Sequence, residues 1–287
     1  MTGNQFRDAV LSGANQLKAH RKEVDELNVF PVPDGDTGTN MSMTISNAAR
    51  QLPRLSEPTL EQAAEETASS LLRGARGNSG VILSLLFRGI AKGLKGLTEA
   101  DGVQFAAALT TGVETAYRAV MKPTEGTILT VARIAAEQAK QTAAQNNDAA
   151  KVFEAAYQAS LQALAATPEL LPVLKKAGVV DAGGKGLTYI FEGMLSVLRD
   201  GVMIDSADEA GEKPEQPAKT AVGEFEGEIT YTYCTEYIVK RDPEITRDPL
   251  SLRAFLESIG DCVVVVDDEK IIKVHVHSDN PGKAIQE

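Results

Sequence analysis

Apolar residues recur at helical spacing through most of the first 200 positions. In the opening stretch, Phe6, Val10 and Leu17 fall near one helical face. The same pattern predicts helices at about 4–27, from about 39 onward, and at 58–73, 79–94, 101–119, 127–144, 148–166 and 185–199. Gly and Pro clusters, which end helices, separate these segments. We therefore expect residues 1–202 to form a many-helix bundle.

The period of the pattern changes after a polar, proline-bearing stretch. Residues 203–223 have no apolar repeat and are predicted to be a linker. Beyond them, two segments with strand-like alternation and two β-branched runs predict strands at 228–233, 235–240, 263–266 and 271–277. A helix is expected at Leu250–Ile259. Residues 224–287 should thus form a smaller α/β domain, and a helix that starts near Pro281 indicates a piece of a longer protein.

Length, charge and cysteine usage narrow the class of protein. The chain has 287 residues, enough for two domains, and a net charge of −11. Such an acidic chain lacks the basic surface of a nucleic-acid-binding protein, so we expect no nucleic-acid partner. Two cysteines provide no disulfide framework and fit a reducing compartment. Neither a secretory signal nor a membrane-length apolar run is present, so we expect a cytoplasmic protein with no membrane span.

The segment 28–40 carries the clearest chemical signal. Asp34 and Asp36 stand two apart, and Gly35 between them permits a turn that brings both carboxylates together. Paired carboxylates repel one another unless a cation joins them, and Mg²⁺ prefers oxygen ligands. The residues that follow lead into a helix, whose N-terminal N–H groups suit phosphate. The alternative is an ordinary turn followed by a helix N-cap.

Three further glycine-rich segments precede predicted helices, at 73–80, 122–127 and 181–186. The first contains Arg73 and Arg76, which would neutralise phosphate charge, but it lacks the lysine and the spacing of a P-loop. Each segment alone is compatible with a simple turn. Loops at one end of an antiparallel bundle meet in space, so we expect the four segments to form one rim.

The second domain offers a different set of ligands. Cys234 lies in a predicted strand, and His275 and His277 are two apart in another, so both imidazoles point to one face. Zinc commonly binds Cys and His. The alternative, left open by spacing alone, is a solvated strand edge with a small buried thiol. His20 is expected to lie at the surface without a partner, and Cys262 in the core.

The motifs, taken in order, carry a family resemblance. The segments NVFPVPDGDTGTNM, GARGNSGVILS, PTEGTILTV and AGVVDAGGKGL resemble the nucleotide-binding domain of the fatty acid kinase A subunit, which is similar to the nucleotide-binding subunit of dihydroxyacetone kinase. This resemblance covers about the first 200 residues. The segments YCTEY and VHVHSDNPG resemble the middle domain of the same family. The implied fold is an eight-helix antiparallel barrel with ATP and two Mg²⁺ ions at its rim, followed by a smaller α/β domain.

The resemblance also implies roles for individual residues. Asp34 and Asp36 would be the catalytic metal ligands, with Asn28 as a third ligand where the dihydroxyacetone kinase pattern has an aspartate. The implied nucleotide-binding positions are Thr37, Thr39, Asn40, Asn78, Ser79, Gly80, Thr127, Asp181, Ala182 and Gly183. In the second domain, Cys234, His275 and His277 would hold Zn²⁺.

The activity implied by the resemblance is transfer of phosphate from ATP to a fatty acid that a separate lipid-binding protein presents. The product would be an acyl phosphate. A fatty carboxylate is already ionised at neutral pH, so the reaction needs no general base. Two alternatives remain: a kinase for dihydroxyacetone or a related small carbonyl compound, and a non-catalytic nucleotide-binding regulator or scaffold. The sequence leaves open the oligomeric state, a homodimer included, and whether this piece is active alone.

Overall fold

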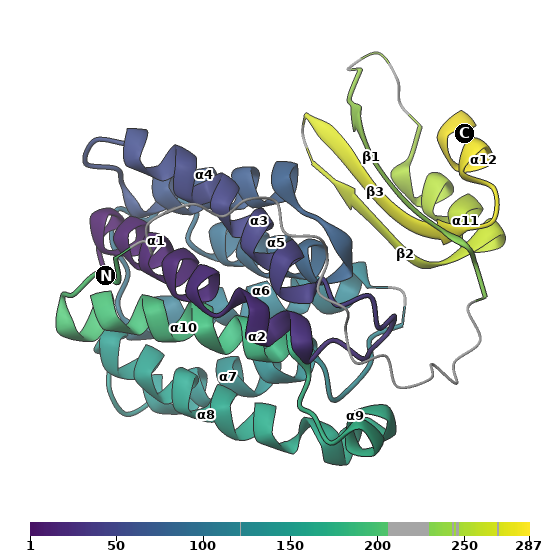
Figure 1. The fold of residues 1–287 in the computed structure, drawn as a ribbon. Coiled ribbons are helices and arrows are strands. Elements are labelled where there is room, and N and C mark those ends of the chain that lie inside the picture. Colours follow the sequence, from purple (N-terminus) through teal and green to yellow (C-terminus); the bar gives the residue numbers. More distant parts are fainter. Residues whose placement is uncertain (121, 206–229, 243, 245–246, 269) are drawn as a thin grey trace.

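The computed structural model describes residues 1–120, 122–205, 230–242, 244, 247–268 and 270–287. A helical body and a smaller sheet domain are visible in Figure 1. The predicted linker at 203–223 lies outside the described residues from position 206 onward. None of the described helices combines the length and apolar content needed to cross a bilayer.

Eight long helices, each of 15 to 22 residues, build the described part of the first domain, which agrees with the expected fold class. They are α1 (Gly3–Ala19), α3 (Thr37–Gln51), α4 (Leu60–Gly74), α5 (Gly77–Gly93), α6 (Gly102–Ala119), α7 (Ile128–Ala143), α8 (Ala149–Leu170) and α10 (Ala182–Asp200). Short turns of helix, α2 (Arg21–Glu26), η1 (Leu52–Arg54) and α9 (Pro172–Ala177), join some of them. The long helices pack against their neighbours to form a ring, which is closed by the contact between α1 and α10.

The single helix expected at 4–27 is wrong, because the chain breaks at His20. The backbone of His20 leaves the helical region, with φ −108° and ψ 12°, and its ring nitrogen bonds to the carbonyl of Gln16. The imidazole stacks on Tyr189 of α10, with ring centroids 4.1 Å apart. The expectation of a surface histidine without a partner is therefore also wrong. Hydrophobic spacing continues across the break, which hid it from the sequence pattern.

Aromatic side chains from three helices form the centre of the helical core. Phe105 lies 5.6 Å from Phe153, and Phe153 meets Phe191 edge to face at 5.2 Å between ring centroids. All three are buried, and each aromatic ring removes a large apolar area from water. This core fixes α6, α8 and α10 relative to one another and thereby sets the positions of their ends.

The second domain contains a three-stranded antiparallel sheet. Its strands are β1 (Tyr233–Lys240), β2 (Gly260–Asp267) and β3 (Ile271–Ser278), in the order β1-β3-β2. Helices α11 (Pro249–Ile259) and α12 (Pro281–Gln286) lie on one side of it (Figure 1). The separate strand predicted at 228–233 is not found: 228–229 are outside the described residues, and 230–232 precede β1. The pairing ends at Tyr233 opposite Ser278, where β3 ends.

The two faces of this sheet have different partners. Val263, Val274 and Val276 form a small core with α11 and α12. On the opposite face, Val264 and Val266 join the core of the helical domain. The ammonium group of the buried Lys273 donates to the carbonyl of Ala75 at 2.5 Å, just before α5. Successive side chains of a strand point to opposite faces, so the face of β3 that carries Lys273 is the one that packs onto the helical domain.

Candidate functional site

The Asp34–Asp36 turn adopts the expected shape. Gly35 has φ +68°, a conformation that favours glycine, and the two carboxylates are close enough to hydrogen-bond when one is protonated. The side-chain amide of Asn28 donates to Asp34 Oδ1 at 2.6 Å. The pair thus converges, and Asn28 lies beside it with its amide in contact.

A different residue caps the helix that follows. Asp36 stands at the N-cap position of α3 but makes no capping bond. Asp25 instead accepts hydrogen bonds from the backbone N–H and the hydroxyl of Thr39, both at 2.8 Å. Asp36 is therefore free of the structural task that would explain it as an ordinary N-cap. A phosphate contact from Thr39 would require its bonds to Asp25 to be replaced.

The electrostatics of the pair suit a cation. Burial and, to a smaller extent, the charge of the neighbouring Asp34 carboxylate together raise the pKa of Asp36 to about 6. Two carboxylates held together in this way repel each other, and a divalent cation between them would relieve the repulsion. The donor set, two carboxylates with an adjacent amide, fits Mg²⁺.

Glycines allow the start of α5 to press against the first turns of α3. Gly77 has φ +58°, and a Cβ there would lie 2.5 Å from Asn40 Nδ2. A Cβ on Gly80 would lie 2.3 Å from the hydroxyl of Thr44. Two helix N-termini are consequently held side by side next to the Asp pair. Their positive dipole ends, together with first-turn N–H groups that have no intrahelical partner, suit an anion such as phosphate.

The other two glycine-rich segments complete the same end of the bundle. Asp181 caps α10, accepting from Gly184 N at 2.6 Å, and it also accepts from the backbone of Ile128 at the start of α7. Full burial raises the pKa of Asp181 to about 6. A Cβ on Gly186 would lie 2.7 Å from Met41 Sδ, which shows how closely α10 approaches α3. The four segments meet at one rim, as the sequence predicted.

Most predicted nucleotide-binding residues near the last two segments are buried. Thr127 caps α7, and its hydroxyl donates to the carbonyl of Thr124 at 2.7 Å. Ala182 and Gly183 are buried in the first turn of α10. These residues shape the floor of the rim, while Asn40, Asn78 and Ser79 are partly exposed at its edge.

The Cys/His group assembles on the sheet face that meets the helical domain. Cys234 pairs with His277 across β1 and β3, and the ligand atoms of Cys234, His275 and His277 lie within 4.8 Å of one another. The ring of His275 is buried, its Nδ1 lies 2.8 Å from Glu236 Oε1, and its Nε2 has no hydrogen-bond partner among the described residues. The thiol of Cys234 lies 4.0 Å from Nδ1 of the same ring, so a buried imidazole with a free Nε2 and a thiol stand together, which fits a zinc ligand set.

Cys262 does not lie in the core, contrary to the sequence prediction. It has φ +51° at a bulge between Asp261 and Val264, so it leaves the alternation of β2. The side chain of Asn78 lies near it, and Asp261, Cys262 and His277 form a second group of ligand atoms within 4.8 Å. The bulge, which the sequence pattern does not announce, is the physical reason for the error.

The two sites that the sequence suggested separately are adjacent. Desolvation raises the pKa of Cys234 to about 11, and the charges of Glu236, Asp34 and Asp36 add to this effect. The Asp pair and the thiol are thus close enough to influence each other's ionisation. Sequence reasoning missed Glu236, although its position two residues after Cys234 on one strand places it on the same face.

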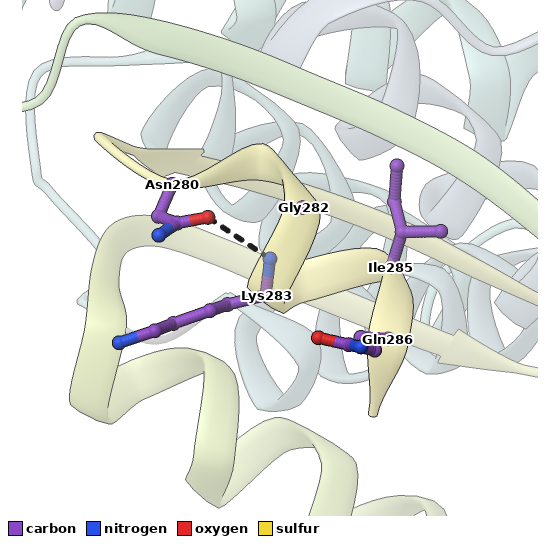
Figure 2. Close-up of a pocket in the computed structure, with 5 residues that line it drawn as sticks. All are labelled: Asn280, Gly282, Lys283, Ile285 and Gln286. Carbon is purple, nitrogen blue, oxygen red and sulfur yellow. Dashed lines mark hydrogen bonds between the residues drawn. The ribbon is translucent and has the colours of Figure 1, made fainter.

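A separate surface hollow lies at α12 and contains none of the predicted site residues. Figure 2 shows it lined by residues from the last helix, with Asn280 Oδ1 accepting from the backbone N–H of Lys283 at 3.1 Å. That bond caps the helix. We therefore locate the candidate site at the rim and not at this hollow.

Comparison with known families agrees with this geometry. The family model described as DAK2 domain matches residues 31–196, which include the Asp34–Asp36 turn and the three later glycine-rich segments; Asn28 precedes the match. The chain belongs to the DAK2 domain family. Residues 230–287, which contain the Cys/His group, match the model that describes the middle domain of proteins like the A subunit of fatty acid kinase.

Curated relatives match over nearly the whole chain. Protein YloV of Bacillus subtilis is 40% identical over 291 residues, covering 99% of this chain and 52% of that protein. An uncharacterised protein of Staphylococcus saprophyticus is 41% identical, covering 98% of this chain and 51% of that protein. This DAK2 chain therefore spans about half the length of the curated relatives it matches.

A solved structure shares the fold of the helical domain. It is the dihydroxyacetone kinase from C. freundii in complex with AMP-PNP and Mg²⁺, at a TM-score of 0.52 and 20% identity. The match covers 66% of this chain and 33% of that one. At this identity the likeness establishes the fold alone.

Proposed function

We propose that this chain is the ATP-binding, phosphoryl-donor part of a kinase that acts on a fatty acid carried by a separate lipid-binding protein. The observation that carries the proposal is the convergence of Asp34 and Asp36 with the starts of four helices at one rim. Carboxylates for metal ions and N–H groups for phosphate are the parts that phosphoryl transfer requires. The AMP-PNP and Mg²⁺ named for the structural neighbour support the choice of nucleotide and metal.

At the rim, each group has a distinct task. Asp34 and Asp36, with Asn28 beside them, would hold two Mg²⁺ ions, which would supply positive charge to neutralise the phosphates. The backbone around Asn78, Ser79 and Gly80, at the start of α5, would orient the phosphates. Thr37 and Asn40 at the start of α3 would do the same from the other side. The walls near Thr127 and Asp181 would contact the nucleoside.

The phosphoryl transfer needs no general base from the protein, because the fatty carboxylate has no proton to lose. An oxygen of the fatty carboxylate attacks the γ-phosphorus of ATP, the bond from that phosphorus to the β,γ-bridging oxygen breaks, and ADP leaves with the electron pair. The product is an acyl phosphate.

The imidazole of His277 is suited to bind a metal. Burial lowers the pKa of His277, and His275 lowers it further, so this imidazole is neutral at pH 7 and available as a ligand.

The middle domain that carries the Cys/His group favours a fatty acid acceptor over a small carbonyl compound. Zn²⁺ held by Cys234, His275 and His277 would supply a Lewis-acid position for an oxygen of the acceptor. The match of residues 230–287 to the middle domain of proteins like the A subunit of fatty acid kinase supports the same acceptor. A fatty-acid-binding partner protein would present the carboxylate to this face.

A transfer assay tests the proposal. Radiolabelled ATP is incubated with the chain and with either a fatty acid on a lipid-binding protein or dihydroxyacetone. We expect label only in the acyl phosphate, and none with Asp34→Ala. Label in dihydroxyacetone phosphate would show that the acceptor is dihydroxyacetone and not a fatty acid. If the full-length relative transfers label and this chain binds Mg²⁺–ATP without turnover, the chain is a nucleotide-binding part that needs the remaining half.

A further inference from the structure

Glu236 lies between the two halves of the candidate site. It follows Cys234 by two positions on β1 and pairs with His275 across the sheet. Its Oε1 is 2.8 Å from Nδ1 of His275, and its side chain is 25% exposed. A carboxylate at this distance accepts the Nδ1 proton, which leaves the lone pair of the ring on Nε2.

The same carboxylate reaches the helical domain. It lies near the backbone N–H of Gly77, the first residue of α5, which stabilises its negative charge. Next to this contact, Lys273 Nζ donates to the carbonyl of Ala75 at 2.5 Å. One side chain of the sheet domain therefore touches both a candidate zinc ligand and the helix start that is predicted to bind phosphate.

Glu236 lies on the polar face of the sheet, the face that meets the helical domain. Its cross-strand partner His275 and the nearby Lys273 share that face. The small core of the sheet domain lies on the other face, among Val274, Val276 and their neighbours. The packing of that core does not require a charged residue at position 236, so its presence calls for another explanation.

We propose that Glu236 is a positioning residue that aims Nε2 of His275 at the zinc position and holds that position over the phosphate-binding start of α5. The inference rests on the proposed function, because it takes Zn²⁺ as the ligand of the Cys/His group. Carboxylates that orient ligating histidines through the second ring nitrogen are a general feature of zinc sites. Here the carboxylate would also fix the distance between the metal and the nucleotide.

Zinc affinity is the first readout, since it needs no turnover. The chain Met1–Glu287 is titrated with Zn²⁺ against a competing chelator. We expect Glu236→Ala to weaken Zn²⁺ binding by about 10- to 100-fold, the usual effect of removing such a carboxylate. Glu236→Gln, which preserves shape, should lie between Glu236→Ala and wild type. Glu257→Gln is the matched control, because this carboxylate lies on α11 and pairs with Arg253.

Hydrogen exchange at α5 is the second readout. Loss of the carboxylate should speed exchange of the Gly77 amide by about 10-fold or more, because the carboxylate that covers this N–H group is gone. A role confined to His275 would not change this amide. Zn²⁺ affinity within about 2-fold of wild type in Glu236→Ala, or unchanged exchange at Gly77, would overturn the inference while leaving the kinase proposal intact. A wild-type chain that binds no Zn²⁺ would remove both the inference and the zinc part of the proposed function.

Discussion

The two halves of the candidate site are built by different means. In the helical half, the backbone does much of the work: two helix starts, one turn with Gly35 at positive φ, and glycines that let α5 approach α3. In the sheet half, side-chain alternation places Cys234, His275 and His277 on one face. The first half suits a phosphate chain with hard cations, and the second suits a softer metal. Each half should therefore fail independently in binding, although the proposed phosphoryl transfer would need both.

Removal of a zinc ligand should give the largest effect. We expect His275→Ala to weaken Zn²⁺ binding by about 100-fold or more, beyond the loss caused by removing its supporting carboxylate. The affinity for Mg²⁺–ATP, measured by calorimetry, should stay within about 2-fold, because the ligands of the nucleotide lie on the helical rim. An equal loss of both affinities would contradict the division into two halves.

The reciprocal change is Asp36→Asn. Loss of one charged metal ligand is worth about 2 kcal/mol, so the affinity for Mg²⁺–ATP should fall by about 30-fold. Zn²⁺ binding should be retained. Asp200→Asn is the control, because Asp200 pairs with Arg199 at the surface of α10. Calorimetry that finds undiminished Mg²⁺–ATP affinity in Asp36→Asn would reject the metal assignment.

A third test compares two glycine substitutions, to separate the cost of a strained backbone from the cost of crowding between α5 and α3. Gly77 and Gly96 both have positive φ, but a Cβ on Gly77 meets Asn40 at 2.5 Å, whereas a Cβ on Gly96 meets nothing within 4 Å. Alanine at Gly96 should cost about 1 kcal/mol, and alanine at Gly77 up to about 1 kcal/mol more, because the side-chain amide of Asn40 has to rotate away. Urea unfolding measures both. Equal losses would mean that α5 does not need its tight contact with α3.

The smallest expected effect is a pH dependence from Asp181. Its pKa is about 6 in the folded chain against an ordinary 3.8, so the folded protein holds a proton that the unfolded chain releases in this window. Its contribution to the free energy of unfolding therefore falls as the pH rises from 3.8 to about 6. In the Asp181→Asn variant the side chain at this position cannot ionise, so this pH-dependent contribution is absent.

Relative to wild type, the Asp181→Asn variant should gain about 1 kcal/mol or more in unfolding free energy between about pH 4 and pH 7. Urea unfolding of both proteins across this range measures the difference. A constant difference at all pH values would show that burial does not perturb this carboxyl group.

Local periodicity predicted most of the elements because it follows from short-range geometry. The long helices and three strands agree with the apolar spacing, and the turn chemistry of Asp34–Gly35–Asp36 was visible in three consecutive residues. The break at His20 was missed because apolar spacing continues through it, and the ring finds its partner, Tyr189, far away in the chain. The bulge at Cys262 was missed because nothing in the run of valines marks it.

By itself the sequence predicted a helical part and a sheet part, the residue types of two candidate metal sites and four glycine-rich helix starts. Only the tertiary structure decided that the Cys/His face is turned toward the Asp pair, that Glu236 joins His275 to Gly77, and that Asp25, not Asp36, caps α3. The reason is physical. Alternation and helix spacing fix which side of an element a residue occupies, whereas the partner it meets there depends on how distant elements pack.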